Sequence, residues 1–162
     1  MKTIKLTQGQ VALVDDEDYI DVARYKWYSA FNRTSMSYYA QRTVLVRGRK
    51  HPEERKNTTR GMHKDIMNSN KGMDIDHINH DTLDNRRCNL RIASRSQNKQ
   101  NERIRKDNKT GHKGVCKRKD KFIAQIQFNK KKIYLGLFDN LDDAAEAYKK
   151  ASRRYFKEFS YL

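Results

Sequence analysis

The sequence has 162 residues, 36% of them hydrophobic and 35% charged, so we expect several small modules rather than one deep core. Its 36 Lys and Arg against 20 Asp and Glu give a formal net charge of +16, which favours a polyanionic partner over a neutral one. No apolar stretch approaches the ~18 residues of a membrane span, and no signal-peptide core is visible, so we expect a cytoplasmic protein without membrane contact. Cys88 and Cys116 form no CxxC pair, which argues against a zinc site or a disulfide framework.

Residues 1–50 predict a β-rich N-terminal unit. Lys5–Val14 and Tyr38–Val46 have the composition of strands, and Asp15–Tyr19 is typical of a polar turn. Aromatic residues concentrate in this unit, and we expect them to pack as a local core, with base stacking as the alternative. They are Tyr19, Tyr25, Trp27, Tyr28, Phe31, Tyr38 and Tyr39.

The next two segments lead into the most polar part of the chain. Arg47–Arg60 contains the only proline and has no periodicity, so it predicts an exposed loop. Gly61–Asn68 has apolar residues at helical spacing and predicts a short helix. His63 lies on or beside its apolar face, where it either packs and hydrogen bonds or contacts a phosphate.

The stretch 74–101 combines an Asp-His pair with several Asn and Arg residues. We expect strands at Met73–His77 and Asn89–Ile92 to form a hairpin, followed by a helix from Ser94 that folds back on it. In that arrangement the helix brings Asn98 towards Asp76.

A carboxylate from Asp76 and an amide oxygen from Asn98 are hard donors that suit one Mg²⁺ or Mn²⁺ ion. His77 has an ordinary pKa of about 6.5 and can accept a proton from an attacking water. The alternative is a hydrogen-bonded structural Asp-His pair without chemistry.

The motifs DHINH, LDN, NLR and SQNKQN resemble the HNH endonuclease family, specifically its phage and intron homing branch, over residues 61–101. The resemblance implies a ββα-metal fold in which His77 is the general base, Asp76 and Asn98 hold the metal, and Asn89 bridges the hairpin to orient His77. It also implies a bacterial or phage-infected host cell as the location.

Two positions differ from common members of that family. Asn98 replaces a His, as in other homing-type members, and His80 replaces a Gly, so we expect a differently shaped loop there. His80 either contacts phosphate or is structural. Four arginines are candidates for clamping neighbouring phosphates. They are Arg86, Arg87, Arg91 and Arg95.

The last third predicts a three-stranded sheet covered by one helix. Apolar and polar residues alternate through Phe122–Leu135, and Asn140 is a plausible N-cap for a helix that follows. We expect one sheet face to contact phosphates and base edges, the alternative being a solvated face. That face is expected to carry Lys117, Lys121, Gln125, Gln127, Lys132 and Tyr134.

The motifs TGHKGV, KFIAQIQ, YLGLFDNLDDAAEAY and FKEFSYL resemble the ethylene-response-factor (Apetala) type of DNA-binding domain over residues 108–162. In that family the sheet lies in the major groove. Cys116 and Phe122 replace the usual Arg and Trp, so base preference does not transfer. The resemblance implies DNA contacts at Lys113, Arg118, Gln125, Gln127, Lys132 and Tyr134.

Together these features predict an α+β chain with three modules. They are a β-rich N-terminal unit (1–50), a central ββα-metal HNH nuclease (51–105) and a DNA-binding domain with a three-stranded antiparallel sheet packed on one helix (106–162). We expect a monomeric, site-specific endonuclease that hydrolyses double-stranded DNA to 5′-phosphate and 3′-hydroxyl ends. The alternatives are a non-catalytic DNA-binding regulator and a nuclease acting on RNA.

Overall fold

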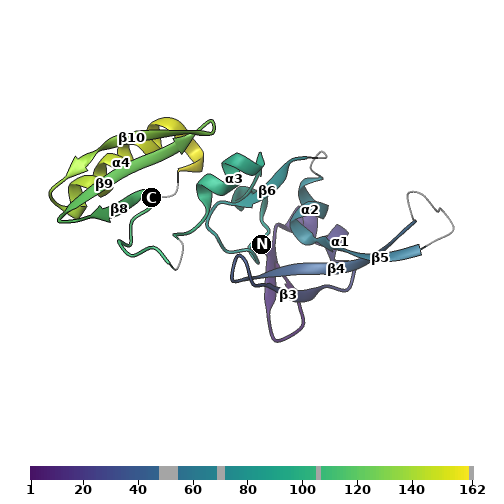
Figure 1. The fold of residues 1–162 in the computed structure, drawn as a ribbon. Helices are drawn as coiled ribbons and strands as arrows, with labels where there is room; N and C mark the ends of the chain where they lie inside the picture. Colours follow the sequence, from purple (N-terminus) through teal and green to yellow (C-terminus); the bar gives the residue numbers. More distant parts are fainter. Residues whose placement is uncertain (48–54, 69–71, 105–106, 161–162) are drawn as a thin grey trace. The chain divides into compact units, whose positions relative to one another are not determined.

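The computed structural model describes residues 1–47, 55–68, 72–104 and 107–160. These residues form an α+β fold that divides into two compact units, Met1–Arg95 and Ser96–Leu162 (Figure 1). The predicted domain boundaries at 50/51 and 105/106 fall on residues outside the described ranges and stay predictions. None of the helices described is long and apolar enough to cross a membrane.

The first unit begins with a two-stranded antiparallel hairpin, β1 (Lys2–Lys5) and β2 (Val11–Val14). The predicted strand Lys5–Val14 is wrong in its first half, because the backbone turns there and the Leu6 N–H donates to the Gln10 carbonyl at 2.9 Å. Helix α1 (Asp16–Ala23) then replaces the predicted polar turn. Acidic residues are common both in turns and in the first turn of a helix. Here they lie in the first turn of α1, where the helix dipole favours negative charge.

A three-stranded antiparallel sheet follows, made of β3 (Tyr28–Asn32), β4 (Ser37–Arg47) and β5 (Arg55–Gly61). The predicted strand Tyr38–Val46 is confirmed, but the predicted loop is wrong over β5, and residues 48–54 of it lie outside the described ranges. All side chains of β5 before Gly61 are exposed, so no alternation marks it. Figure 1 shows the outer part of β4 and β5 running on as a two-stranded ribbon.

The polar stretch folds largely as predicted. Helix α2 (Met62–Met67) is followed by β6 (Asp74–His77), the 3₁₀ turn η1 (Arg87–Asn89) and β7 (Leu90–Ala93), and β6 pairs antiparallel with β7. Helix α3 (Arg95–Asn101) begins directly after this hairpin.

One core joins the N-terminal strands to the hairpin. It includes Trp27, whose indole N–H donates to the Val22 carbonyl at 2.7 Å. It also includes Ile75 and Leu90 from the hairpin. The predicted aromatic core is wrong for Tyr25 and Phe31, which are 41% and 46% exposed. The hairpin loop is held further by β2, because Leu13 exchanges backbone hydrogen bonds of 2.9 Å with Leu83 and Asn85.

The second unit confirms the predicted sheet and helix. Strands β8 (Val115–Arg118), β9 (Lys121–Phe128) and β10 (Lys131–Phe138) form an antiparallel sheet in the order β10-β9-β8, and α4 (Leu141–Phe156) covers one face, followed by η2 (Lys157–Phe159). The Asn140 side chain accepts from the Asp143 N–H at 2.8 Å, as an N-cap should. Gly114 has φ +68°, and a Cβ there would lie 2.1 Å from the Tyr148 ring, so the close approach of sheet and helix requires glycine.

Candidate active site

The β6–β7 hairpin presents Asp76 and His77 side by side. In the register of the hairpin Asp76 lies opposite Arg91 and His77 opposite Leu90. Both side chains are buried, each residue with 6% of its surface exposed. A buried Asp-His pair held on paired strands has little freedom to move, which suits a site that must orient one water molecule.

Asn89 closes the loop directly after His77. Its backbone carbonyl accepts from the Ile78 N–H at 2.9 Å, and its side-chain oxygen accepts from the Asn79 N–H at 2.9 Å. The amide of the same side chain donates to the Asp84 carbonyl at 2.8 Å. Asn89 is therefore placed to hold the main chain that follows His77, as a bridging residue would.

The loop between the strands has a conformation that its sequence only partly indicates. His80 has φ +63°, a left-handed conformation that glycine adopts without steric cost, and its N–H donates to the His77 carbonyl at 3.1 Å. Asp84 anchors the other side of the loop by accepting from the Asn79 amide at 3.0 Å. The turn is thus fixed at both ends.

Burial lowers the pKa of His77 below its usual 6.5. The Asn85 side chain and the carboxylates of Asp76, Asp81 and Asp84 act in the opposite direction but do not cancel the effect of burial. At neutral pH the imidazole is therefore neutral, which is the form that can accept a proton.

Two aromatic rings from the N-terminal part of the unit surround His77. The His63 ring on α2 lies with its centroid 5.3 Å from that of His77, at an interplanar angle of 78°. The centroid of the Tyr39 ring on β4 lies 6.2 Å from that of His77 and 6.0 Å from that of His63. Burial, followed by the neighbouring His77 and Lys64, lowers the pKa of His63 to about 3, so this ring is neutral as well.

Asp76 has a strong partner in the strand opposite. The Arg91 Nε and Nη2 atoms lie 2.8 and 2.7 Å from the same carboxylate oxygen, Oδ2. A buried carboxylate fits a hard divalent ion by its chemistry. Asn98, the second predicted metal ligand, lies on α3 in the second unit, and its pairing with Asp76 stays a prediction.

The predicted phosphate-clamping arginines mostly contact carboxylates. Arg86 donates to both oxygens of Asp84 at 2.7 Å, which lowers the pKa of Asp84. Arg87 binds Asp18 of α1 with both Nε and Nη2, at 2.8 and 2.7 Å. Arg91 is held on Asp76, while Arg95 and Arg87 are both exposed. Their contacts with DNA stay predictions.

In the second unit the strand register sorts the predicted DNA-contacting residues by face. Lys132 pairs with Gln127 and Tyr134 pairs with Gln125, on the face turned away from the buried Ala124. Tyr134 is 63% exposed.

The predicted face is wrong for Lys117. Lys117 pairs with Phe122, which shares the face of Ala124 under α4, so Lys117 sits at the edge of the helix-covered side. Arg118 takes the outer face instead, paired with Lys121.

Lys113, another predicted DNA contact, lies just before β8. Its ammonium lies 2.7 Å from the Gln100 carbonyl, and burial lowers the pKa of Lys113 to about 8.

A family model described as HNH endonuclease matches residues 68–100. The match supports a nuclease of the HNH kind, and such a nuclease implies DNA as substrate. It covers β6, η1 and β7, with Asp76, His77 and Asn89 on them. None of the curated proteins compared with the chain matches it.

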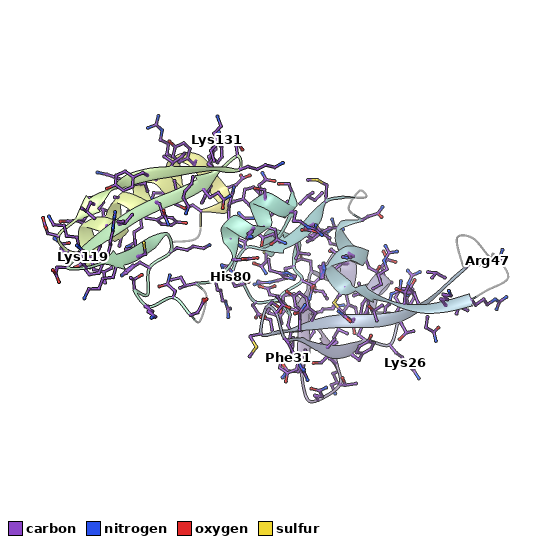
Figure 2. All side chains as sticks on the ribbon, in the orientation of Figure 1. Lys26, Phe31, Arg47, His80, Lys119 and Lys131 are labelled. Atoms are coloured by element: carbon purple, nitrogen blue, oxygen red, sulfur yellow. The ribbon has the colours of Figure 1, made fainter. Side chains whose placement is uncertain are left out.

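Two features of the first unit were missed by sequence reasoning. The Tyr39 and His63 rings meet His77 only through folding, and no local pattern marks that contact. The other is the β4–β5 ribbon, where Arg47 and Arg55 face each other across the strands; Figure 2 shows Arg47 near the outer end of the ribbon. A run of polar and basic residues was its only sequence signal.

Proposed function

We propose that the chain is a homing-type HNH endonuclease that cuts double-stranded DNA at a specific site. The observation that carries this proposal is the buried, neutral His77 beside Asp76 on the β6–β7 hairpin, within the HNH match. An HNH reaction needs a base that is uncharged at neutral pH and rigidly held, and both properties follow from the burial and pairing described above.

In this proposal His77 takes a proton from a water molecule, which then attacks the scissile phosphate. Asn89 holds the loop after His77, so that the imidazole keeps its orientation towards the attacking water. Hydrolysis breaks the bond between phosphorus and the 3′ oxygen, leaving 5′-phosphate and 3′-hydroxyl ends.

Asp76 and Asn98 would hold one divalent ion, Mg²⁺ or Mn²⁺, since a carboxylate and an amide oxygen are hard donors. A divalent ion bound there would stabilise the negative charge that develops on the phosphate and on the leaving oxygen. Arg91 would fix the carboxylate of Asp76 for that role, because it holds Oδ2 from the opposite strand.

Recognition would come from surfaces outside this small site. The outer face of the β8–β10 sheet carries Gln125, Gln127, Lys132 and Tyr134, which suit base edges and phosphates in a major groove. The exposed Arg47 and Arg55 of the ribbon would add phosphate contacts in the first unit. A basic chain with net charge +16 is expected to bind DNA with a steep salt dependence.

The proposal is tested with purified protein, Mg²⁺ and a library of plasmids and genomic fragments. We expect discrete products whose 5′ ends accept a ligated 3′-hydroxyl strand without prior phosphorylation, and no products when EDTA is present. Binding without nicking or linearisation on any of these DNAs would refute the nuclease and leave the DNA-binding regulator as the function.

A further inference from the structure

We propose that His63, a residue outside the HNH match, is a positioning residue for His77. This inference rests on the proposed function, because it assigns His63 to the same reaction. His63 comes from α2 and contacts the base through its ring rather than through the hairpin. Its role is to hold the imidazole of His77 in the orientation that accepts the proton.

Three neighbours confine the His63 ring. The rings of Tyr39 and His77 lie edge-on to it, with centroids 6.0 and 5.3 Å away, in the T-shaped geometry that aromatic rings favour. On a further side the ring lies against the backbone of Gly61, where a Cβ would come within 2.6 Å of the ring atom Cε1. A ring held in this way cannot rotate without displacing His77 or Tyr39.

The elements around the ring are themselves fixed. Met62 and Ile66, which flank His63 on α2, are buried in the core of the first unit. Arg42 of β4 and Asp65 of α2 form an ion pair of 2.7 Å that ties the Tyr39 strand to the His63 helix. The two rings therefore reach His77 from a rigid support, which is what a precise orientation of the base requires.

Gly61 offers a test that removes no functional group. Its φ of −79° is accessible to alanine, so Gly61→Ala introduces no backbone strain, and the added methyl can be accommodated only by moving the His63 ring. We expect Gly61→Ala to lower the single-turnover cleavage rate by about tenfold or more, because small misplacements of catalytic groups cost up to about a hundredfold.

His63 itself is replaced by Ala and by Phe. We expect His63→Ala to lower the cleavage rate with an unchanged DNA dissociation constant, and His63→Phe to restore most of it, because a ring is what packs against His77. His112→Ala, in the second unit, serves as the matched histidine control and should cleave like wild type. Equal losses in His63→Ala and His63→Phe, or wild-type cleavage by His63→Ala and Gly61→Ala, would overturn the proposal.

An NMR measurement separates this proposal from the nuclease itself. The ¹⁵N shifts of the His77 imidazole, recorded without DNA, should change in His63→Ala and Gly61→Ala and stay near wild type in His63→Phe. If neither wild type nor any variant cleaves DNA but these shifts follow the pattern, the nuclease fails and the ring contact stands. If wild type cleaves and the shifts do not move, the positioning role fails alone.

Discussion

Arg91 on β7 holds the carboxylate of Asp76 on β6, with Nε and Nη2 at 2.8 and 2.7 Å from a single oxygen. Both side chains are largely buried, so this is not a surface ion pair of small energetic value. A residue predicted to clamp DNA phosphates is thus engaged in the site itself, and removing it would leave a buried carboxylate without the guanidinium that offsets its charge.

Arg91→Ala should therefore lower the free energy of unfolding by about 3 kcal/mol, as breaking a buried ion pair does. Mg²⁺ should recover more of this loss than it adds to wild type, because it can neutralise Asp76. Denaturant titrations with and without Mg²⁺ measure both effects. Arg95→Ala, at an exposed position, is the matched control. It should weaken DNA binding and reduce by about 1 the slope of log binding constant against log salt concentration (the salt slope). Equal stability of the two variants would contradict this account.

Asn89→Ala removes the acceptor for the Asn79 N–H and the donor to the Asp84 carbonyl. Because these groups are partly or fully buried, we expect a loss of about 2 kcal/mol in unfolding free energy, together with slower cleavage. Asn57→Ala, on the exposed β5 strand, should change stability by less than about 0.5 kcal/mol. A stability of Asn89→Ala indistinguishable from that of Asn57→Ala would show that the bridge is unimportant.

The pKa of His63, about 3 against 6.5 in the unfolded chain, makes stability depend on pH. Above pH 6.5 both states are neutral at this residue; as pH falls from 6.5 towards 3, only the unfolded chain takes up the proton, and stability is lost. At pH 5 the loss should be about 1 to 2 kcal/mol. His63→Phe should reduce the fall in unfolding free energy between pH 7 and pH 5. An unchanged fall would show that the pH dependence of stability does not come from His63.

The register of the second unit separates two lysines of equal charge. Lys132 lies on the outer face beside Gln127, whereas Lys117 shares the side of Phe122. If the outer face contacts DNA, Lys132→Ala should weaken binding and reduce the salt slope by about 1, while Lys117→Ala should change the slope less. Binding isotherms over a salt series measure this, and a reversed order would place the contact elsewhere.

Elements with strong periodicity or specific motifs were predictable. The alternation in β9 and the helical spacing in α4 reflect one-sided burial, and the sequence around Asp76 and His77 marked the hairpin. Strand β5 has no buried face along Arg55–Arg60 and so left no pattern.

Long-range partners left no pattern either. The Asp18 carboxylate that binds Arg87 is 69 residues away in the sequence. The pairing of Arg91 with Asp76 was not predictable either, because it forms only once β6 and β7 are aligned. The contact of His63 with His77 likewise depends on how α2 docks beside β6. Local chemistry pointed to His77 as the proposed base, and the tertiary fold supplied the rings around it.

The most direct test of the central claim is the single-turnover rate of DNA cleavage by His77→Ala in Mg²⁺, measured beside wild type on a DNA that wild type cuts. We predict a rate lower by about 10² to 10⁴-fold, the usual contribution of a general base, with a DNA dissociation constant within about twofold of wild type. Cleavage by His77→Ala at the wild-type rate would contradict the account.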